Sequence, residues 1–388
     1  MKIVVNKNTP CVVEMFSHLG AVVALDTPAV TRQAVHDADM LIVRSETIVD
    51  KDLLEGSAVR FVGSVTIGTD HVDLAYLASR GIAFASAPGS NSASVAEYVA
   101  AALLMWMRRT GDTLKGKSIG IVGVGNVGSK VVRVAEALGM NVLLNDPPLA
   151  RLSGDPKYLT LDELMGADFV TLHVPLTKSG PDPTYHLFSD ARIGNMGRNS
   201  VLVNTSRGAV VETSALRQAL ASHRLSAAIL DVWEREPSID LDLLSLVMIG
   251  TPHIAGYSLD GKLNALRLVH EEACRFLGVP SEGKSGEPSA SSDLPRIEIP
   301  SNLTEDLDVV HAAVRAVYDI ESDDKLLRHI GTMKEEERDR YFMRLRAEYR
   351  VRREFFHRVV DLLPEQATAR RILHQLGFKT TLGDIEGQ

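Results

Sequence analysis

The chain has 388 residues, 45% of them hydrophobic and 24% charged, which is typical of a folded protein with more than one domain. Its formal net charge of -8 argues against a nucleic-acid partner, because such binding depends on an excess of Lys and Arg. The two cysteines, Cys11 and Cys274, are too few for a disulfide framework or a zinc site built from thiolates, so we expect a reducing, cytoplasmic setting and no metal. The most apolar run, 99–107, is far shorter than the about 20 residues of a spanning helix, so we expect no membrane partner.

Short β-branched runs alternate with helical segments in the first part of the chain. Strands are predicted at 2–6, 40–43, 61–65 and 82–85, with a helix at 73–80 between the last two. Because strands that alternate with helices usually form a parallel sheet, this part is predicted to be an α/β lobe.

A long apolar helix, predicted over 94–108, precedes a second series of the same kind. The strands predicted in this series are 118–122, 142–145, 169–174, 201–204, 227–230 and 247–249. Two such series in one chain predict an α/β fold with two Rossmann-like, doubly wound lobes and a cleft between them.

The C-terminal part begins with a change in composition. Residues 281–293 are dominated by Ser, Gly and Pro, which predicts a linker. After it, a short alternating run at 296–299 and a helical pattern at 305–318 predict a third, α+β domain over 294–388. Three apolar side chains in this domain follow one another at helical spacing and form a stripe: Tyr341, Leu345 and Tyr349. The stripe could dock on a partner or pack within its own chain. The sequence leaves both alternatives open.

The stretch 123–128 (GVGNVG) has the GxGxxG spacing and lies between a predicted strand and a predicted helix. In that context Gly123 makes a tight turn, Gly125 lets the backbone approach a pyrophosphate, and Gly128 allows the helix to pack closely. The N-terminus of the helix then favours the negative charge of the phosphates. The stretch therefore predicts a dinucleotide site, with a Gly-rich turn that binds no ligand as the alternative.

Asp146 ends the next predicted strand, where a carboxylate would bind a ribose 2′-hydroxyl. The same carboxylate would repel the 2′-phosphate of NADP, and the next basic residue is Arg151. The sequence therefore predicts NAD rather than NADP as the cofactor.

Polar side chains follow three successive strands of the second series. Arg207, Glu236 and His253 each follow a different strand, and Asp231 comes directly after the middle one. Ligands of open parallel sheets bind outside the carboxyl ends of the strands. We therefore expect these four side chains at one edge of the sheet.

The four side chains suit the oxidation of a 2-hydroxy acid. The fork of Arg207 can grip a carboxylate and polarise the neighbouring C2 oxygen. A histidine such as His253 can take the hydroxyl proton while a hydride leaves the same carbon. Glu236 would orient the imidazole, and Asp231 is placed for the nicotinamide end. Each residue alone has a structural explanation, but together, downstream of a dinucleotide motif, they predict a dehydrogenase.

The motifs GVGNVG, NTSRG, DVWEREP and TPHIAGY resemble those of the D-2-hydroxyacid dehydrogenase family over residues 1–280. The stretches VRS, VTIGTDHVD, APGSN and HIAGYSLDGK are similar to members that act on a phosphorylated 2-hydroxy acid and carry a C-terminal dimerisation domain. The resemblance implies a homodimer that uses NAD. It also implies a substrate-binding lobe at 1–93 and 257–280, an NAD-binding Rossmann domain at 94–256 and a dimerisation domain at 294–388.

The same resemblance implies roles for individual residues. It assigns catalysis to Arg207, Glu236 and His253. It assigns substrate binding to Ser45, Thr66 and Tyr257. Besides the glycines of the loop, it assigns contacts with NAD to Asn126, Val127, Asp146, Val174, Thr205, Ser206, Arg207, Asp231 and Gly256.

Three questions stay open at this level. The substrate could be another 2-hydroxy acid, such as phosphoglycerate. A regulatory protein that senses NADH could use the same fold. Arg44, beside Ser45, is the nearest candidate for the charge of a substrate phosphate, although a surface salt bridge would explain it equally well.

Overall fold

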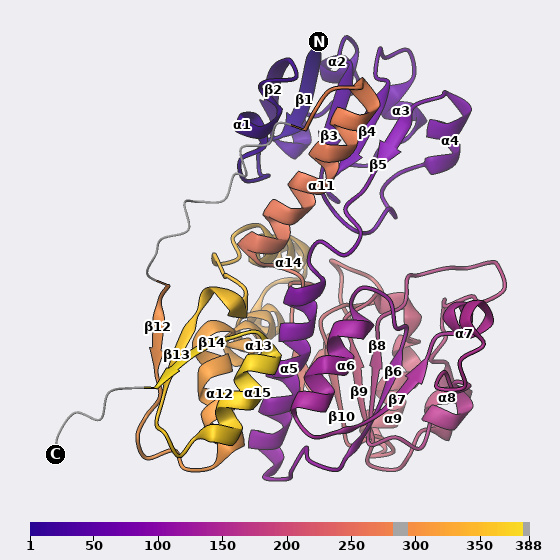
Figure 1. Cartoon of the computed structure of the whole chain (residues 1–388). Helices are drawn as coiled ribbons and strands as arrows, with labels where there is room; N and C mark the ends of the chain where they lie inside the picture. Colours follow the sequence, from indigo (N-terminus) through magenta and orange to yellow (C-terminus); the bar gives the residue numbers. More distant parts are fainter. Residues whose placement is uncertain (282–293, 383–388) are drawn as a thin grey trace. The chain divides into compact units, whose positions relative to one another are not determined.

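The computed structural model describes residues 1–281 and 294–382, and the chain divides into two compact units (Figure 1). The first unit consists of Met1–Asn91 and Ser258–Asp293, and the second of Ser92–Tyr257 and Leu294–Gln388. All but the first residue of the predicted linker at 281–293 lies outside the described residues. Within the described ranges, no helix is both long and apolar enough to cross a bilayer.

The first unit contains a five-stranded parallel sheet with the order β2-β1-β3-β4-β5. Its strands are β1 (Lys2–Asn6), β2 (Ala21–Leu25), β3 (Met40–Val43), β4 (Phe61–Ser64) and β5 (Ala83–Ala85). The sequence analysis missed β2. This strand lies at the edge of the sheet and is largely exposed, so it has little of the buried apolar pattern that marks the central strands.

Helices cover both faces of this sheet. They are α1 (Val12–Phe16), α2 (Arg32–Val35), α3 (Lys51–Leu54), α4 (Leu74–Ser79) and α11 (Leu259–Leu277). Alternate strand residues enter two cores, one shared with α1 and α11 and the other with α2, α3 and α4. The packing of α11 is close, since a Cβ at Gly63 of β4 would lie 2.4 Å from Val269 Cγ1.

The second unit is built on a six-stranded parallel sheet with the order β11-β10-β9-β8-β6-β7. Its strands are β6 (Ser118–Val122), β7 (Asn141–Asn145), β8 (Phe169–Leu172), β9 (Val201–Asn204), β10 (Ala227–Leu230) and β11 (Ile249–Gly250). The four central strands are buried almost throughout, as their uninterrupted apolar runs predict. Because all strands are parallel, their carboxyl ends lie at one edge.

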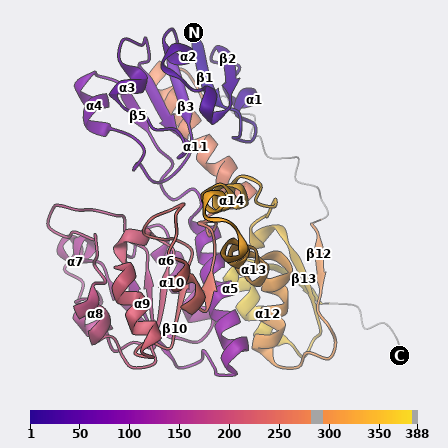
Figure 2. The same cartoon turned by 180° about the vertical axis from the view of Figure 1, so that it is seen from behind.

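Helices also cover both faces of the second sheet. One face packs against α5 (Ser92–Thr110) and α6 (Gly128–Ala137), which Figure 1 shows to the left of the strands. The other face packs against α8 (Asp190–Asn195), α9 (Thr213–Ala221) and α10 (Leu241–Leu246), seen in Figure 2. A short helix, α7 (Pro147–Ser153), follows β7. The predicted fold class, parallel-sheet Rossmann-like lobes, is confirmed.

Over residues 294–382, the C-terminal segment adds a three-stranded parallel sheet and four α-helices to the second unit. The strands are β12 (Arg296–Glu298), β13 (Val359–Leu362) and β14 (Lys379–Leu382). The helices are α12 (Asp306–Val317), α13 (Ile320–Arg328), α14 (Glu335–Ala347) and α15 (Ala367–Leu376). The predicted α+β character of this segment is therefore confirmed.

Buried polar contacts attach this segment to α5. Ser94 Oγ donates to Glu354 at 2.6 Å, and the Phe355 N–H donates to Glu97 at 2.6 Å. Glu97 also pairs with Arg352, and both side chains are buried. Burial raises the pKa of Glu97 to about 8, although the charge of Arg352 opposes the shift. The C-terminal segment and α5 therefore belong to one continuous core.

The stripe of Tyr341, Leu345 and Tyr349, which begins on α14, makes contacts within its own chain. Tyr341 is buried and its hydroxyl donates to the Leu326 carbonyl at 2.8 Å. The Tyr349 hydroxyl donates to Asp323 at 3.0 Å, and Leu345 packs against the core beside α14.

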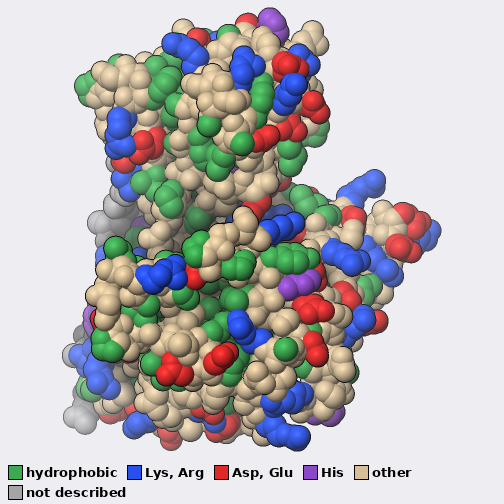
Figure 3. Space-filling model, turned by 90° about the vertical axis from the view of Figure 1, so that its right-hand side faces the viewer, with side chains coloured by type: hydrophobic (Ala, Val, Ile, Leu, Met, Phe, Trp, Pro, Cys, Tyr) green, Lys and Arg blue, Asp and Glu red, His purple; other side chains and the backbone are tan. Residues whose placement is uncertain are grey.

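On the face shown in Figure 3, basic and acidic side chains are interspersed.

Candidate active site

The loop 123–128 connects β6 to α6, and two of its glycines, Gly123 and Gly128, leave no room for a side chain. Gly123 has φ +88°, and a Cβ there would lie 2.7 Å from the His173 carbonyl oxygen. A Cβ at Gly128 would lie 2.0 Å from the Gly123 carbonyl oxygen. In contrast, a Cβ at Gly125 would meet no atom within 4 Å, so the space outside it is open. A dinucleotide-binding loop needs a tight turn, close packing of the helix and open space in which the backbone can contact the pyrophosphate. Gly123, Gly128 and Gly125 provide these three features in that order.

The two residues after Gly125 lie where the helix begins. Asn126 is exposed, and Val127 is the N-cap residue of α6. The first N–H groups of a helix have no partner within it, so this end offers donors to an anion.

Asp146 directly follows β7 and contacts this loop. Its Oδ2 accepts a hydrogen bond from the Val124 N–H at 2.8 Å, and its Oδ1 accepts one from the Leu149 N–H at 3.0 Å, which caps α7. A carboxylate has about four acceptor positions, so a ribose hydroxyl can still bind. Arg151, five residues farther along the chain, pairs with Asp182 through Nη1 and Oδ1 at 3.0 Å, so its guanidinium is already engaged.

The turn after β9 places Thr205, Ser206 and Arg207 at the carboxyl edge of the sheet. Asn204 shapes this turn, because its Oδ1 accepts from the Ser206 N–H at 3.0 Å and from Ser206 Oγ at 2.8 Å. Its Nδ2 donates to the Arg207 carbonyl at 3.0 Å. The Ser206 side chain therefore serves the turn, so its contact with a cofactor would come from the backbone. Arg207 Nη1 donates to the Ser206 carbonyl at 2.8 Å.

The next residue brings this turn against the loop after β10. A Cβ at Gly208 would lie 1.9 Å from the Trp233 carbonyl carbon, so only glycine allows this approach. The Trp233 N–H in turn donates to Glu236 Oε1 at 2.8 Å. Arg207 and Glu236 therefore belong to two loops in direct backbone contact.

Glu236 and His253 form a hydrogen-bonded pair. Glu236 Oε2 lies 2.7 Å from His253 Nδ1, and both side chains are partly exposed. Burial acts to raise the pKa of Glu236, but the charge and hydrogen bond of His253 and the Trp233 N–H outweigh it and lower the pKa. The pair is therefore an ionised carboxylate that fixes one nitrogen of an imidazole.

The backbone of His253 has φ 58°, which is uncommon for a residue with a side chain. The surrounding contacts hold it there. The His253 N–H donates to the Asp231 carbonyl at 2.7 Å. The Asp231 carboxylate accepts from the N–H groups of Ile254 and Ala255 at 2.8 and 2.9 Å, and from Thr251 Oγ1 at 2.7 Å. Unusual backbone conformations of this kind concentrate at functional sites.

Asp231 is almost fully buried beneath the 251–255 loop, and Gly256 follows that loop, half-buried. Burial raises the pKa of Asp231, against the effect of His253 and the three hydrogen bonds. In the structure this carboxylate organises the loop that carries His253.

Arg346, which the sequence analysis missed, also lies at this site. It belongs to α14, and its guanidinium carbon lies 6.0 Å from the ring centroid of Tyr257. Its charge contributes to the lowered pKa of Glu236. Tyr257 also contacts the ring of Tyr349, edge to face, at 5.9 Å between centroids. No sequence spacing links α14 to the loop of His253, so only the fold reveals this neighbour.

His173 is a second residue that the sequence analysis missed. It follows β8, and its Nδ1 lies 3.2 Å from Thr205 Oγ1 while its Nε2 lies 3.0 Å from Thr171 Oγ1. Burial lowers the pKa of His173 to about 3, so the ring is neutral near pH 7. The adjacent Val174 packs against the glycine loop, since its Cγ1 would lie 2.9 Å from a Cβ at Gly123.

The predicted substrate residues Ser45 and Thr66 belong to the first unit, and Tyr257 to the second. Val43 of β3 pairs with Ser64 of β4. Ser45 and Thr66 each follow their strand by two residues, so both lie at the same edge of that sheet. Thr66 Oγ1 lies 2.8 Å from Ser64 Oγ, which lies 3.0 Å from His71 Nε2. A hydrogen-bonded chain therefore orients the Thr66 hydroxyl.

Two cations of the first unit lie near this edge. Arg44 donates to the Asn8 carbonyl at 3.2 Å and lies 3.4 Å from the Glu46 carboxylate. Lys262, in the first turns of α11, has its pKa lowered by burial and by the charge of Arg44, with Glu46 opposing. The charges of Arg44 and Glu46 both act on Lys262, so these three side chains lie near one another although Lys262 is distant in sequence.

Comparisons with known proteins agree with this geometry. The model of the D-isomer-specific 2-hydroxyacid dehydrogenase NAD-binding domain matches residues 95–255. A second model, described as a domain of unknown function (DUF3410), matches residues 290–377. The first match covers the glycine loop, Asp146, Arg207, Glu236 and His253.

Solved structures share the fold. An NAD-dependent formate dehydrogenase from Staphylococcus aureus, in complex with NAD, is 26% identical with a TM-score of 0.61, over 71% of this chain and 96% of that one. A D-lactate dehydrogenase from Aquifex aeolicus, complexed with NAD and lactic acid, is 27% identical with a TM-score of 0.59, over 72% of this chain and 94% of that one.

Curated relatives match nearly the whole chain. The erythronate-4-phosphate dehydrogenase of Marinobacter nauticus is 40% identical over 98% of this chain and 99% of its own length. That of Salinibacter ruber is 45% identical over 91% of this chain and 92% of its own length. The chain therefore belongs to the erythronate-4-phosphate dehydrogenase family of D-isomer-specific 2-hydroxyacid dehydrogenases.

Proposed function

We propose that this protein catalyses the NAD-dependent oxidation of 4-phosphoerythronate at C2, giving the 2-oxo acid, as a step in pyridoxal phosphate biosynthesis. The observation that carries the proposal is the Glu236–His253 pair at 2.7 Å, at the carboxyl edge of a dinucleotide-binding sheet. The full-length similarity to erythronate-4-phosphate dehydrogenases supplies the substrate.

His253 is the acid and base of the proposed reaction. Glu236 binds Nδ1, which leaves Nε2 to take the proton of the C2 hydroxyl. The ionised carboxylate stabilises the imidazolium that forms. Asp231 acts through the backbone, because it fixes the loop that sets the ring in place.

Arg207 binds the substrate carboxylate in this proposal. Its guanidinium offers two parallel donors, which match the two oxygens of a carboxylate. The hydrogen bond to the Ser206 carbonyl restrains the side chain before substrate arrives, so less conformational entropy is lost on binding.

The residues of the second unit fit NAD. The open space outside Gly125 and the N-terminus of α6 suit the pyrophosphate, and Asp146 suits the ribose. Asn126, Val127, Val174, Thr205, Ser206, Arg207, Asp231 and Gly256 complete the proposed contacts, with backbone groups for Ser206. When bound, NAD accepts the hydride that leaves C2.

The first unit contributes the remaining substrate contacts. We assign the hydroxyls of Ser45 and Thr66 to the substrate, together with that of Tyr257. Arg44 and its neighbour Lys262 form the cationic pair that suits the phosphate, because an anion relieves the repulsion between them.

We propose that the C-terminal segment makes a homodimer. Among its residues that the structure describes, three large hydrophobic side chains are exposed, Leu326, Val351 and Phe356, and Val351 is 81% exposed. Val351→Asp is expected to shift sedimentation toward the monomer. Leu152→Asp is the matched control, because Leu152 is 84% exposed on α7, outside this segment.

Both cysteines are free thiols, which agrees with the proposed cytoplasmic location.

The direct test is formation of NADH by the purified protein with 4-phosphoerythronate, followed by absorbance. His253→Asn should abolish turnover and keep NAD binding, because Asn tolerates the positive φ of this position. His186→Asn is the control, since His186 also has a positive φ and pairs with Glu234 at 2.7 Å. If the wild type binds NAD and oxidises no 2-hydroxy acid, the protein is a regulator and the proposal fails.

A further inference from the structure

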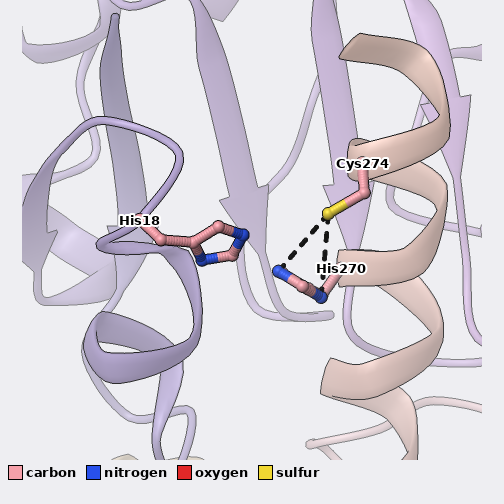
Figure 4. Close-up of side chains that lie close together, drawn as sticks. All are labelled: His18, His270 and Cys274. Atoms are coloured by element: carbon pink, nitrogen blue, oxygen red, sulfur yellow. Dashed lines mark hydrogen bonds between the residues drawn. The ribbon is translucent and has the colours of Figure 1, made fainter. Parts of the chain in front are cut away.

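Three metal-binding side chains converge in the first unit, and the proposed reaction uses none of them (Figure 4). His18 follows α1, while His270 and Cys274 are four residues apart on α11 and therefore share one helix face. One ligand atom from each residue lies within 4.8 Å of the others. The segments are distant in sequence, which is why no metal motif is visible there.

The distance between the two ligands on α11 fits a tetrahedral metal site, and the His18 ligand atom completes a cluster within 4.8 Å. With bonds of about 2.0–2.1 Å to nitrogen and about 2.3 Å to sulfur, two ligands of a tetrahedral zinc ion lie roughly 3.3–3.6 Å apart. Cys274 Sγ lies 3.5 Å from His270 Nε2 and 4.0 Å from Nδ1, and the first of these distances matches. His18 is exposed and lies outside the helices, so its ring can move the short remaining distance.

We propose that His18, His270 and Cys274 bind a zinc ion, with water in the fourth position. Two imidazoles and one thiolate are ligands that zinc prefers, whereas magnesium and calcium prefer oxygen. The sequence analysis predicted no metal because two cysteines are too few for a zinc site built from thiolates. A site with two histidines needs only one cysteine, so that argument does not apply to it.

The surroundings support a cation. The Glu271 carboxylate acts electrostatically on both His270 and Cys274. The ring of Phe16 packs edge-on against His270 at 5.3 Å between centroids, which holds the imidazole in place. A bound ion would join the turn after α1 to α11.

Ordinary packing is the competing explanation, and it makes a different prediction. A buried cysteine that contacts a histidine on the same helix needs no third residue. The exposed His18 ring, with its centroid 5.0 Å from that of His270, contributes little to the core but completes the ligand set. Dependence of metal affinity on His18 therefore separates the two explanations.

The test uses the full chain, reduced and stripped of metal with a chelator. Zinc is titrated against a chromophoric competitor, and Co²⁺ is added separately to record visible and near-ultraviolet spectra. The variants are His18→Ala and Cys274→Ser, with His36→Ala and Cys11→Ser as controls that lie in the same unit. Circular dichroism verifies folding, and His18→Ala is the informative variant if Cys274→Ser unfolds.

The wild type and both controls are expected to bind one zinc ion per chain. Both site variants should bind zinc at least about tenfold more weakly. Co²⁺ should give the intense bands of a tetrahedral site and a thiolate charge-transfer band that needs Cys274. Equal zinc affinity in the wild type and His18→Ala would overturn the proposal, and so would a Co²⁺ spectrum without the thiolate band.

Discussion

Glu236 Oε2 lies 2.7 Å from Nδ1 of His253, and the other oxygen of the same carboxylate accepts the Trp233 N–H at 2.8 Å. The carboxylate is thus held at both oxygens before it orients the ring. One residue therefore both orients the imidazole ring and places a negative charge beside it.

Glu236→Gln should lower kcat by roughly a hundredfold, because the neutral amide cannot stabilise an imidazolium. The pH dependence of kcat should shift in the same variant. Glu234→Gln is the matched control, since Glu234 pairs with His186. A kcat for Glu236→Gln as high as that of the control would remove the pair from the mechanism.

Arg207→Lys should lower kcat/KM by roughly a hundredfold, because a point charge does not replace a planar fork. The Kd for NAD, measured by fluorescence titration, should change less than about twofold. Arg217→Lys, at a partly exposed pair with Asp240, should behave like the wild type. Near-normal turnover of Arg207→Lys would contradict the assignment of the carboxylate to Arg207.

Asp146 should set the preference for NAD. Asp146→Ser keeps a side chain that can cap α7 and removes the charge that repels a 2′-phosphate. We expect the ratio of kcat/KM for NAD over NADP to fall at least about tenfold. Asp155→Ser, at an exposed neighbouring carboxylate, is the control. A wild type that uses both cofactors equally would contradict the role of Asp146.

His173 should make the fold sensitive to acid. Its pKa is about 3 in the folded protein, against about 6.5 for an ordinary histidine, so below pH 6.5 only the unfolded chain gains this proton. The free energy of unfolding therefore falls as the pH drops from 6.5 toward 3. At pH 5 the loss from this residue should be about 1–2 kcal/mol.

His173→Asn removes that contribution and should flatten the pH dependence, measured by urea unfolding between pH 7 and pH 5. The exposed His36→Asn is the control. Parallel pH profiles for His173→Asn and the wild type would show that His173 is protonated in the folded protein as well.

The sequence predicted what depends on local pattern. The central strands were found because branched apolar runs such as Val201–Asn204 suit a sheet buried on both faces. The glycine loop was found because its GxGxxG spacing lies between a strand and a helix, which is the context of a dinucleotide site. The edge strand β2 was missed, since its exposed side chains leave no such pattern.

Residues that act through tertiary neighbours could not be predicted in this way. Arg346 reaches Tyr257 from α14, and Lys262 reaches Arg44 from α11. Each contact joins parts of the chain that no periodicity links. The same is true of His18 and the two ligands on α11.

The measurement that tests the central claim most directly is kcat/KM with NAD for 4-phosphoerythronate, unphosphorylated erythronate and 3-phosphoglycerate under identical conditions. The account predicts the highest kcat/KM for 4-phosphoerythronate and a marked loss of kcat/KM when the phosphate is removed. In a Lys262→Met variant, removal of the phosphate should cause a smaller loss than in the wild type. Equal values with and without the phosphate, or a higher value for 3-phosphoglycerate, would contradict it.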